Sequence, residues 1–182
     1  MNYRRWIFVA TIIFSIGLVF GSATSTSVID PLFEDVAALQ EPNNTLVPSK
    51  FFTVILILAR NASVLLLSFA LSPIFCLMPI LALTFNGWFL AFISVLVIQE
   101  ESLGFVLVGL LPHGVFELPA FILGEAAALS FGAMAILALF KEEKRNLLLP
   151  SLKRNLKYLV VALALLVPAA IIEIYITPLL LT

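Results

Sequence analysis

Long apolar runs separated by short polar breaks make up almost the whole chain. The runs cover residues 6–20, 51–71, 74–98, 103–140 and 158–181. A helix of about 20 apolar residues suffices to cross a bilayer, so the fourth run is too long for one simple span. Residues 112–114 divide it. We therefore predict an all-α, polytopic transmembrane helix bundle. It has about five spans and a broken or re-entrant half-helix at 103–111, followed by a helix over 115–140 that bends at Pro119.

Two interpretations are open for the first run. Arg4 and Arg5 precede it and small residues follow it, which is the pattern of a signal peptide cleaved after Ala23. Alternatively the run is a retained first span. In that case Gly17 and Gly21, four residues apart, allow another helix to approach closely.

The composition supports a membrane protein. Of 182 residues, 62% are hydrophobic and only 12% are charged, and the mean hydropathy is +1.15. Soluble domains have roughly half apolar and a quarter charged residues. We expect one integral membrane domain over residues 1–182. The net charge of -1 does not suggest a nucleic-acid partner, and the single cysteine, Cys76, excludes an internal disulfide.

Basic residues cluster between alternate spans and so predict the orientation. Eight of the ten lysines and arginines fall on one side if the N-terminus is cytoplasmic. These are Arg4, Arg5, Lys141, Lys144, Arg145, Lys153, Arg154 and Lys157. We predict a multi-pass protein of the cell membrane with the N-terminus cytoplasmic, the C-terminus external, an external loop at 22–49 and a cytoplasmic basic segment at 141–157. Part of that segment, 151–157, is expected to lie along the membrane surface.

A few polar side chains interrupt the apolar runs. They are Arg60, Asn61, Asn86, His113, Glu117, Glu125 and Glu173. A charged side chain in the middle of a span costs about 2.5–3.5 kcal/mol on insertion scales, so such groups face one another or a wet cavity. We predict that Arg60, Asn61, Asn86, His113 and Glu117 meet in one layer around an Arg60–Glu117 ion pair.

That layer has two interpretations, a polar cavity with a function or a structural clamp between helices. His113 and Glu117 share a face if the helix begins by Pro112, because they are four residues apart. Glu125 lies nearer the cytoplasmic end, off that face. Glu173 is either a further member or reaches the outer interface.

A stripe of small residues at spacing four follows the proline-rich break. It consists of Gly124, Ala128 and Gly132. Such stripes let helices pack closely. The contact is either within the chain, which we favour, or with a second copy.

No enzyme motif is present, and we expect no catalytic residue, no metal and no cofactor. His113 and Glu117 supply two ligands where structural zinc takes four. A histidine beside a carboxylate can nevertheless exchange protons near neutral pH.

The block Pro112-His113-Gly114-Val115-Phe116-Glu117-Leu118-Pro119-Ala120, followed by a helix rich in glycine and alanine, resembles the signature of the stage II sporulation protein M family. Asn61 and the Asn86-Gly87 pair match the other polar marks of that family in order. The resemblance runs from the first span to the last. In spore-forming bacteria it implies a membrane component that holds peptidoglycan-degrading partners at the septal membrane. For this chain, the resemblance implies the membrane fold and the polar motif. It does not imply a role in sporulation, because relatives also occur in organisms that form no spores.

Three functions follow from these observations. The first is a non-enzymatic assembly or scaffold component of a membrane complex. The second is a transporter or channel-like protein that moves a small solute or protons past the polar layer, and the third is an intramembrane enzyme. The expected partners are the lipid bilayer, other membrane or envelope proteins and a second copy of the chain.

Overall fold

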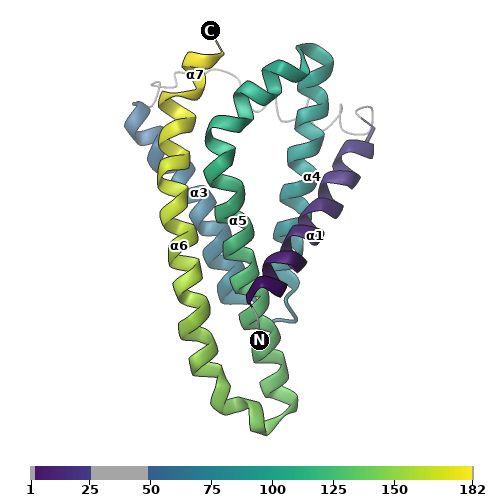
Figure 1. The fold of residues 1–182 in the computed structure, drawn as a ribbon, viewed down its shortest axis with the longest axis vertical. Helices are drawn as coiled ribbons and strands as arrows, with labels where there is room; N and C mark the ends of the chain where they lie inside the picture. The colour runs from purple at the N-terminus through teal and green to yellow at the C-terminus, as the bar shows by residue number, and fades with distance from the viewer. Residues whose placement is uncertain (1–2, 26–48, 182) are drawn as a thin grey trace, which may run out of the picture.

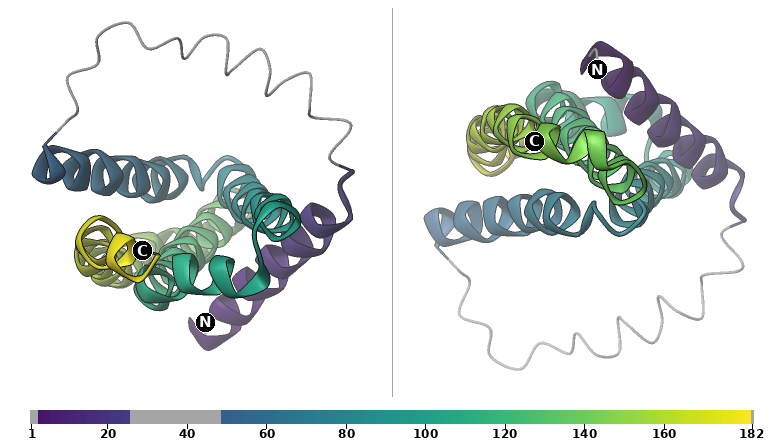
Figure 2. Two further views of the ribbon diagram at one scale, coloured as in Figure 1. Left: turned by 90° about the horizontal axis from the view of Figure 1, so that it is seen from above. Right: turned by 90° about the horizontal axis from the view of Figure 1, so that it is seen from below.

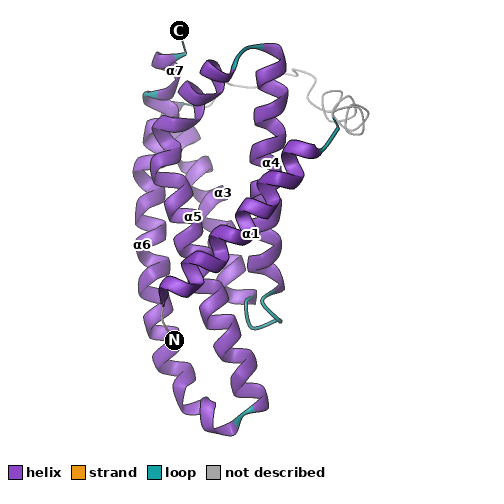
Figure 3. Ribbon diagram, turned by 45° about the vertical axis from the view of Figure 1, so that its right-hand side comes forward, coloured by secondary structure: helices purple, strands orange, loops and turns teal. Residues whose placement is uncertain are grey.

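The described part of the chain is a helix bundle, seen from the side with its long axis vertical in Figure 1 and from its two ends in Figure 2. The computed structural model describes residues 3–25 and 49–181, and within these ranges every regular element is helical (Figure 3). The elements are α1 (Tyr3–Ala23), α3 (Lys50–Leu71), α4 (Leu77–Glu100), α5 (Leu103–Phe140), the 3-10 helix η2 (Glu142–Leu147), α6 (Leu148–Tyr175) and α7 (Thr177–Leu180). Five described helices, with η2 and α6 taken together, are long and apolar enough to cross a membrane. The predicted all-α bundle of about five spans is confirmed. Most of the expected external loop 22–49 lies outside the described residues.

Helix α5 is the central element of the bundle. It contacts α1, α3, α4 and α6, and 56% of its most apolar window is buried, against 17–28% for the other four spans. Its hydrophobic residues point in all directions, as they do in a helix surrounded by others. Glu125, in the buried second half of α5, is therefore held inside protein rather than against lipid.

The prediction that the helix is broken at residues 112–114 is wrong. The helix runs without interruption from Leu103 to Phe140 and contains both Pro112 and Pro119. Residues 103–111 are thus the first part of a long helix, and this part leans away from the axis of the remainder (Figure 1). Proline removes a backbone donor and bends a helix, and neighbouring helices make this tolerable in a membrane bundle.

The basic segment 141–157 does not run along the membrane surface in its part 151–157, as was expected. It forms η2 and the first turns of α6, which continue directly into the last span. The hairpin made by α5, η2 and α6 extends beyond the ends of the other helices, at the same end as the start of α1 (Figure 1). The eight basic residues thus share one end of the bundle, and its assignment to the cytoplasm stays a prediction.

Helices α1 and α4 pack backbone to backbone through glycines. A Cβ atom at Gly17 would overlap the carbonyl oxygen of Thr84, and one at Gly21 would overlap that of Trp88. Gly87 meets the carbonyl oxygen of Phe14 in the same way. The small-residue pair therefore contacts α4 within the chain.

The stripe on α5 also packs within the chain. Ala128 is fully buried. A Cβ atom at Gly124 would come within 2.8 Å of the Leu65 side chain, and one at Gly132 would overlap the carbonyl oxygen of Ser72. This stripe faces α3 and the turn that follows it, so it is not free to bind a second copy.

Gly17→Ala should destabilise the protein, because the added methyl group forces α1 and α4 apart. We expect a loss of about 1–3 kcal/mol in the free energy of unfolding, as for other overpacked contacts, measured by thermal or denaturant unfolding in lipid nanodiscs. The matched control is Gly104→Ala, where a Cβ atom meets only the Ser102 Oγ at 3.7 Å. Equal stability of the two variants would contradict the close α1–α4 contact.

Candidate functional site

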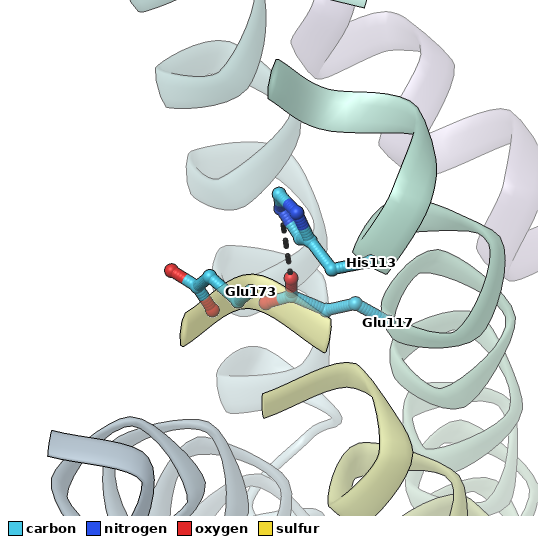
Figure 4. Close-up of side chains that lie close together, drawn as sticks. All are labelled: His113, Glu117 and Glu173. Atoms are coloured by element: carbon cyan, nitrogen blue, oxygen red, sulfur yellow. Dashed lines mark ion pairs between the residues drawn. The ribbon is translucent and has the colours of Figure 1, made fainter. Parts of the chain in front are cut away.

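Three ionisable side chains meet between α5 and α6. His113 and Glu117 come from α5 and Glu173 from the end of α6 (Figure 4). One nitrogen or oxygen atom from each residue can be chosen so that all three lie within 4.8 Å of one another. Glu173, which the sequence left between two interpretations, is placed beside the histidine–glutamate pair.

Glu117 is held from a third helix. Its Oε1 accepts a hydrogen bond of 2.8 Å from Asn61 Nδ2 on α3. Its Oε2 lies 3.8 Å from His113 Nε2, which is longer than a hydrogen bond. Asn61 therefore fixes one carboxylate oxygen and leaves the other directed toward the histidine.

The histidine has unused hydrogen-bonding capacity. Its Nδ1 is buried and has no hydrogen-bond partner within the described ranges. The side chains of His113 and Glu117 are 13% and 31% exposed. A purely structural clamp would be closed to solvent and fully hydrogen bonded. The cluster of His113, Glu117 and Glu173 is neither.

The predicted Arg60–Glu117 ion pair is not formed. Arg60 is exposed on α3, and no described carboxylate lies within ion-pair distance of it. It acts on the cluster at longer range, through its charge on Glu173. Neighbouring positions on a helix point about 100° apart, so Asn61 turns inward to Glu117 and Arg60 turns outward.

Asn86 does not join the cluster either. Its Nδ2 donates to the carbonyl oxygen of Ala82, one turn earlier on its own helix. It lies on the same face of α4 as Leu90 and Ser94, which line a groove of about 220 Å³ against the first part of α5. His113 lines the same groove, so the groove reaches the cluster from the α4 side.

Glu125 forms a separate contact two turns further along α5. It is fully buried and accepts a hydrogen bond from Ser68 Oγ on α3, while its Oε1 has no partner among the described residues. The two contacts repeat along one seam, because Ser68 follows Asn61 by seven residues and Glu125 follows Glu117 by eight. Helix α3 supplies both donors and α5 both acceptors.

Sequence reasoning missed Ser68. Its signal was the seven-residue spacing from Asn61, which places two polar residues on one face of a largely apolar helix. A serine in a membrane helix often donates its hydroxyl to a backbone carbonyl of the same helix. The spacing alone therefore did not show that Ser68 donates to another helix.

The fold and the site define a polytopic α-helical membrane protein with a polar cluster inside its bundle. The model of the family named stage II sporulation protein M matches residues 10–178, so the chain belongs to this family. It is 28% identical over 173 residues to an uncharacterized protein of Methanocaldococcus jannaschii, covering 94% of this chain and 93% of that protein. No solved structure matches the chain. The resemblance read from the proline-rich block is confirmed.

The contact between Asn61 and Glu117 should appear as an energetic coupling. In a double-mutant cycle of Asn61→Ala and Glu117→Ala, we expect a coupling of about 0.6–1.7 kcal/mol, the range for hydrogen bonds between membrane helices. The measurement is unfolding or steric trapping in bicelles. A control cycle of Asn61→Ala with Glu125→Ala joins residues without a mutual contact and should give a coupling near zero. Coupling of equal size in both cycles would show that the variants act through general disruption.

Proposed function

We propose that this protein is a non-enzymatic assembly component of a membrane complex, and that it binds a partner helix on the outer face of α3. The observation that carries the proposal is Arg60. It is the eleventh of the 22 residues of α3 and is exposed there. An arginine in the middle of a span is costly against lipid and is usually covered by protein or water.

The surroundings of Arg60 favour a helix as the cover. Exposed residues recur along the same face at spacings of four, three and four, namely Leu56, Arg60, Ser63 and Leu67. Ala59 and Ser63 form a pair of small residues four apart beside the arginine. This combination of a small-residue pair and a polar group is typical of helix–helix contacts in membranes.

Charge argues for a different protein rather than a second copy. A symmetric dimer through this face would set α3 against α3, because both copies use the same surface. The two Arg60 side chains would then face each other with like charge. A partner helix with a carboxylate near its middle complements the guanidinium, which pairs with carboxylates through two parallel hydrogen bonds.

The family gives the proposal its context. The expectation from the resemblance was a membrane component that holds other proteins, and sporulation itself is not carried over. Sidedness remains part of the proposal, with the N-terminus and the basic α5–η2–α6 hairpin in the cytoplasm and the protein in the cell membrane.

Transport is a second candidate, favoured by the groove between α4 and α5 that reaches His113. A small solute or proton entering there would meet His113 and Glu117. If this is the function, Glu117→Gln protein in proteoliposomes folds normally and loses flux, whereas the assembly proposal predicts no flux from the wild-type protein.

The assembly proposal is tested by separating folding from binding. Arg60→Leu should insert at least as well as wild type, because the exchange favours insertion by about 3–4 kcal/mol on the insertion scale. The same variant should lose its partner. The measurement is a photocrosslinking residue at position 63 in native membranes, followed by identification of the adduct by mass spectrometry.

The control places the crosslinker at position 161, where Val161 is 50% exposed on α6. We expect a discrete protein adduct from position 63 only, and its disappearance with Arg60→Leu but not with Arg60→Lys. If the identified partner carries a carboxylate in its span, Arg60→Glu should lose the adduct. Replacing that partner carboxylate by lysine should restore the adduct with the Arg60→Glu variant. Lipid adducts alone at both positions, or an adduct with a second copy of this chain, would overturn the proposal.

A further inference from the structure

We propose that His113, Glu117 and Glu173 bind one divalent transition-metal ion between α5 and α6, with Zn²⁺ as the reference ion. His113 and Glu117 alone supply two ligands, and for that reason we expected no metal from the sequence. The fold adds the third from the last span. The inference goes beyond the proposed assembly role and does not depend on the partner of α3.

The distances suit a single ion. Zinc lies about 2.0–2.2 Å from nitrogen and oxygen ligands, so two ligands at a tetrahedral angle are about 3.3–3.6 Å apart. His113 Nε2 and Glu117 Oε2 are 3.8 Å apart, and all three chosen donor atoms lie within 4.8 Å of one another. The proposal requires the Glu173 carboxylate to move about 1 Å closer, from at most 4.8 Å to the roughly 3.3–3.6 Å that a tetrahedral site needs.

The donor set selects the class of ion. Imidazole with carboxylates suits zinc and other first-row divalent metals, whereas magnesium and calcium prefer oxygen alone. Three protein ligands leave one coordination position open, as in zinc sites that bind water or a substrate. The groove against α4 reaches His113, so a small ligand can approach the site from there.

The state of the side chains also points to a cation. Two carboxylates lie close together inside an apolar bundle, where negative charges repel more strongly than in water, and the Arg60 charge acts on Glu173 only at longer range. Among the described residues, His113 Nδ1 has no hydrogen-bond partner, and Nε2 lies 3.8 Å from Glu117 Oε2, beyond hydrogen-bond distance. A divalent ion bound at His113 Nε2, the nitrogen that faces Glu117 Oε2, compensates both charges.

A supporting contact is already in place beside the cluster. Asn61 donates to Glu117 Oε1 and so directs Oε2 toward the other two residues. Hydrogen bonds of this kind orient metal ligands and raise affinity. Asn61 is thus a positioning residue in this site and does not touch the ion.

The test is metal binding by the full chain in nanodiscs, purified with a tag that contains no histidine. After removal of metal, the protein is titrated with Zn²⁺, followed by calorimetry, and with Co²⁺, followed by its visible absorption. We expect one ion per chain. Glu173→Gln and His113→Gln should each weaken binding by at least about 10-fold, since even loss of a supporting hydrogen bond costs 10- to 100-fold.

The matched control is Glu125→Gln, which alters another buried carboxyl of α5 that lies outside the cluster. It should bind Zn²⁺ like wild type. Arg60→Leu should also keep the ion, because it removes a neighbouring positive charge, so failure of the partner proposal leaves this one standing. Folding of each variant is checked by thermal unfolding.

Absence of Zn²⁺ and Co²⁺ binding by the folded wild-type protein overturns the inference, whatever the variants do. Equal loss of binding in Glu125→Gln and Glu173→Gln overturns it as well. A loss of ion binding restricted to His113→Gln, Glu173→Gln and Asn61→Ala supports it.

Discussion

The need to keep carboxylates away from lipid governs this structure. Glu117 and Glu125 both lie on the central helix α5, and both receive a hydrogen bond from α3. An unpaired carboxylate at either position would be far more costly in a membrane than in water. The pairing of α3 with α5 fixes the rotation of both helices. It thereby decides which residues of α3 turn inward, such as Asn61, and which turn outward, such as Arg60.

Close packing of small residues makes those hydrogen bonds attainable. Gly124 receives the Leu65 side chain between the two carboxylate contacts, so α3 and α5 approach closely along the whole seam. On the other side of α5, glycines in α1 and α4 allow an equally close pair. In the absence of a hydrophobic driving force between helices, contact of this kind and hydrogen bonding hold a membrane bundle together. The polar cluster is therefore supported by helices that cannot easily move apart.

The sequence was sufficient to predict the number of spans, the helical class, the family and most of the polar residues that lie within the spans. Each of these depends on local hydrophobicity or on a short motif. Contacts between helices were not. The rotation of α3 about its axis decides whether Arg60 or Asn61 contacts Glu117. The two residues are adjacent in the sequence, and the sequence of α3 alone does not show which of them faces α5. The side chain of Asn86 donates its hydrogen bond to a backbone carbonyl of its own helix, as any side-chain amide can. The continuity of α5 through Pro112 depends on neighbouring helices, which residues 103–140 alone do not describe.

The order of the helices along the chain has a consequence for biogenesis. Helix α3 is synthesised before α5, so Asn61 and Ser68 are already in the bilayer when Glu117 and Glu125 arrive. The two acidic residues of α5 can leave the translocon directly onto waiting donors. Glu173 is delivered last, by the final span, and until then the histidine–glutamate pair is incomplete. Insertion of α6 is thus the step that completes the polar cluster.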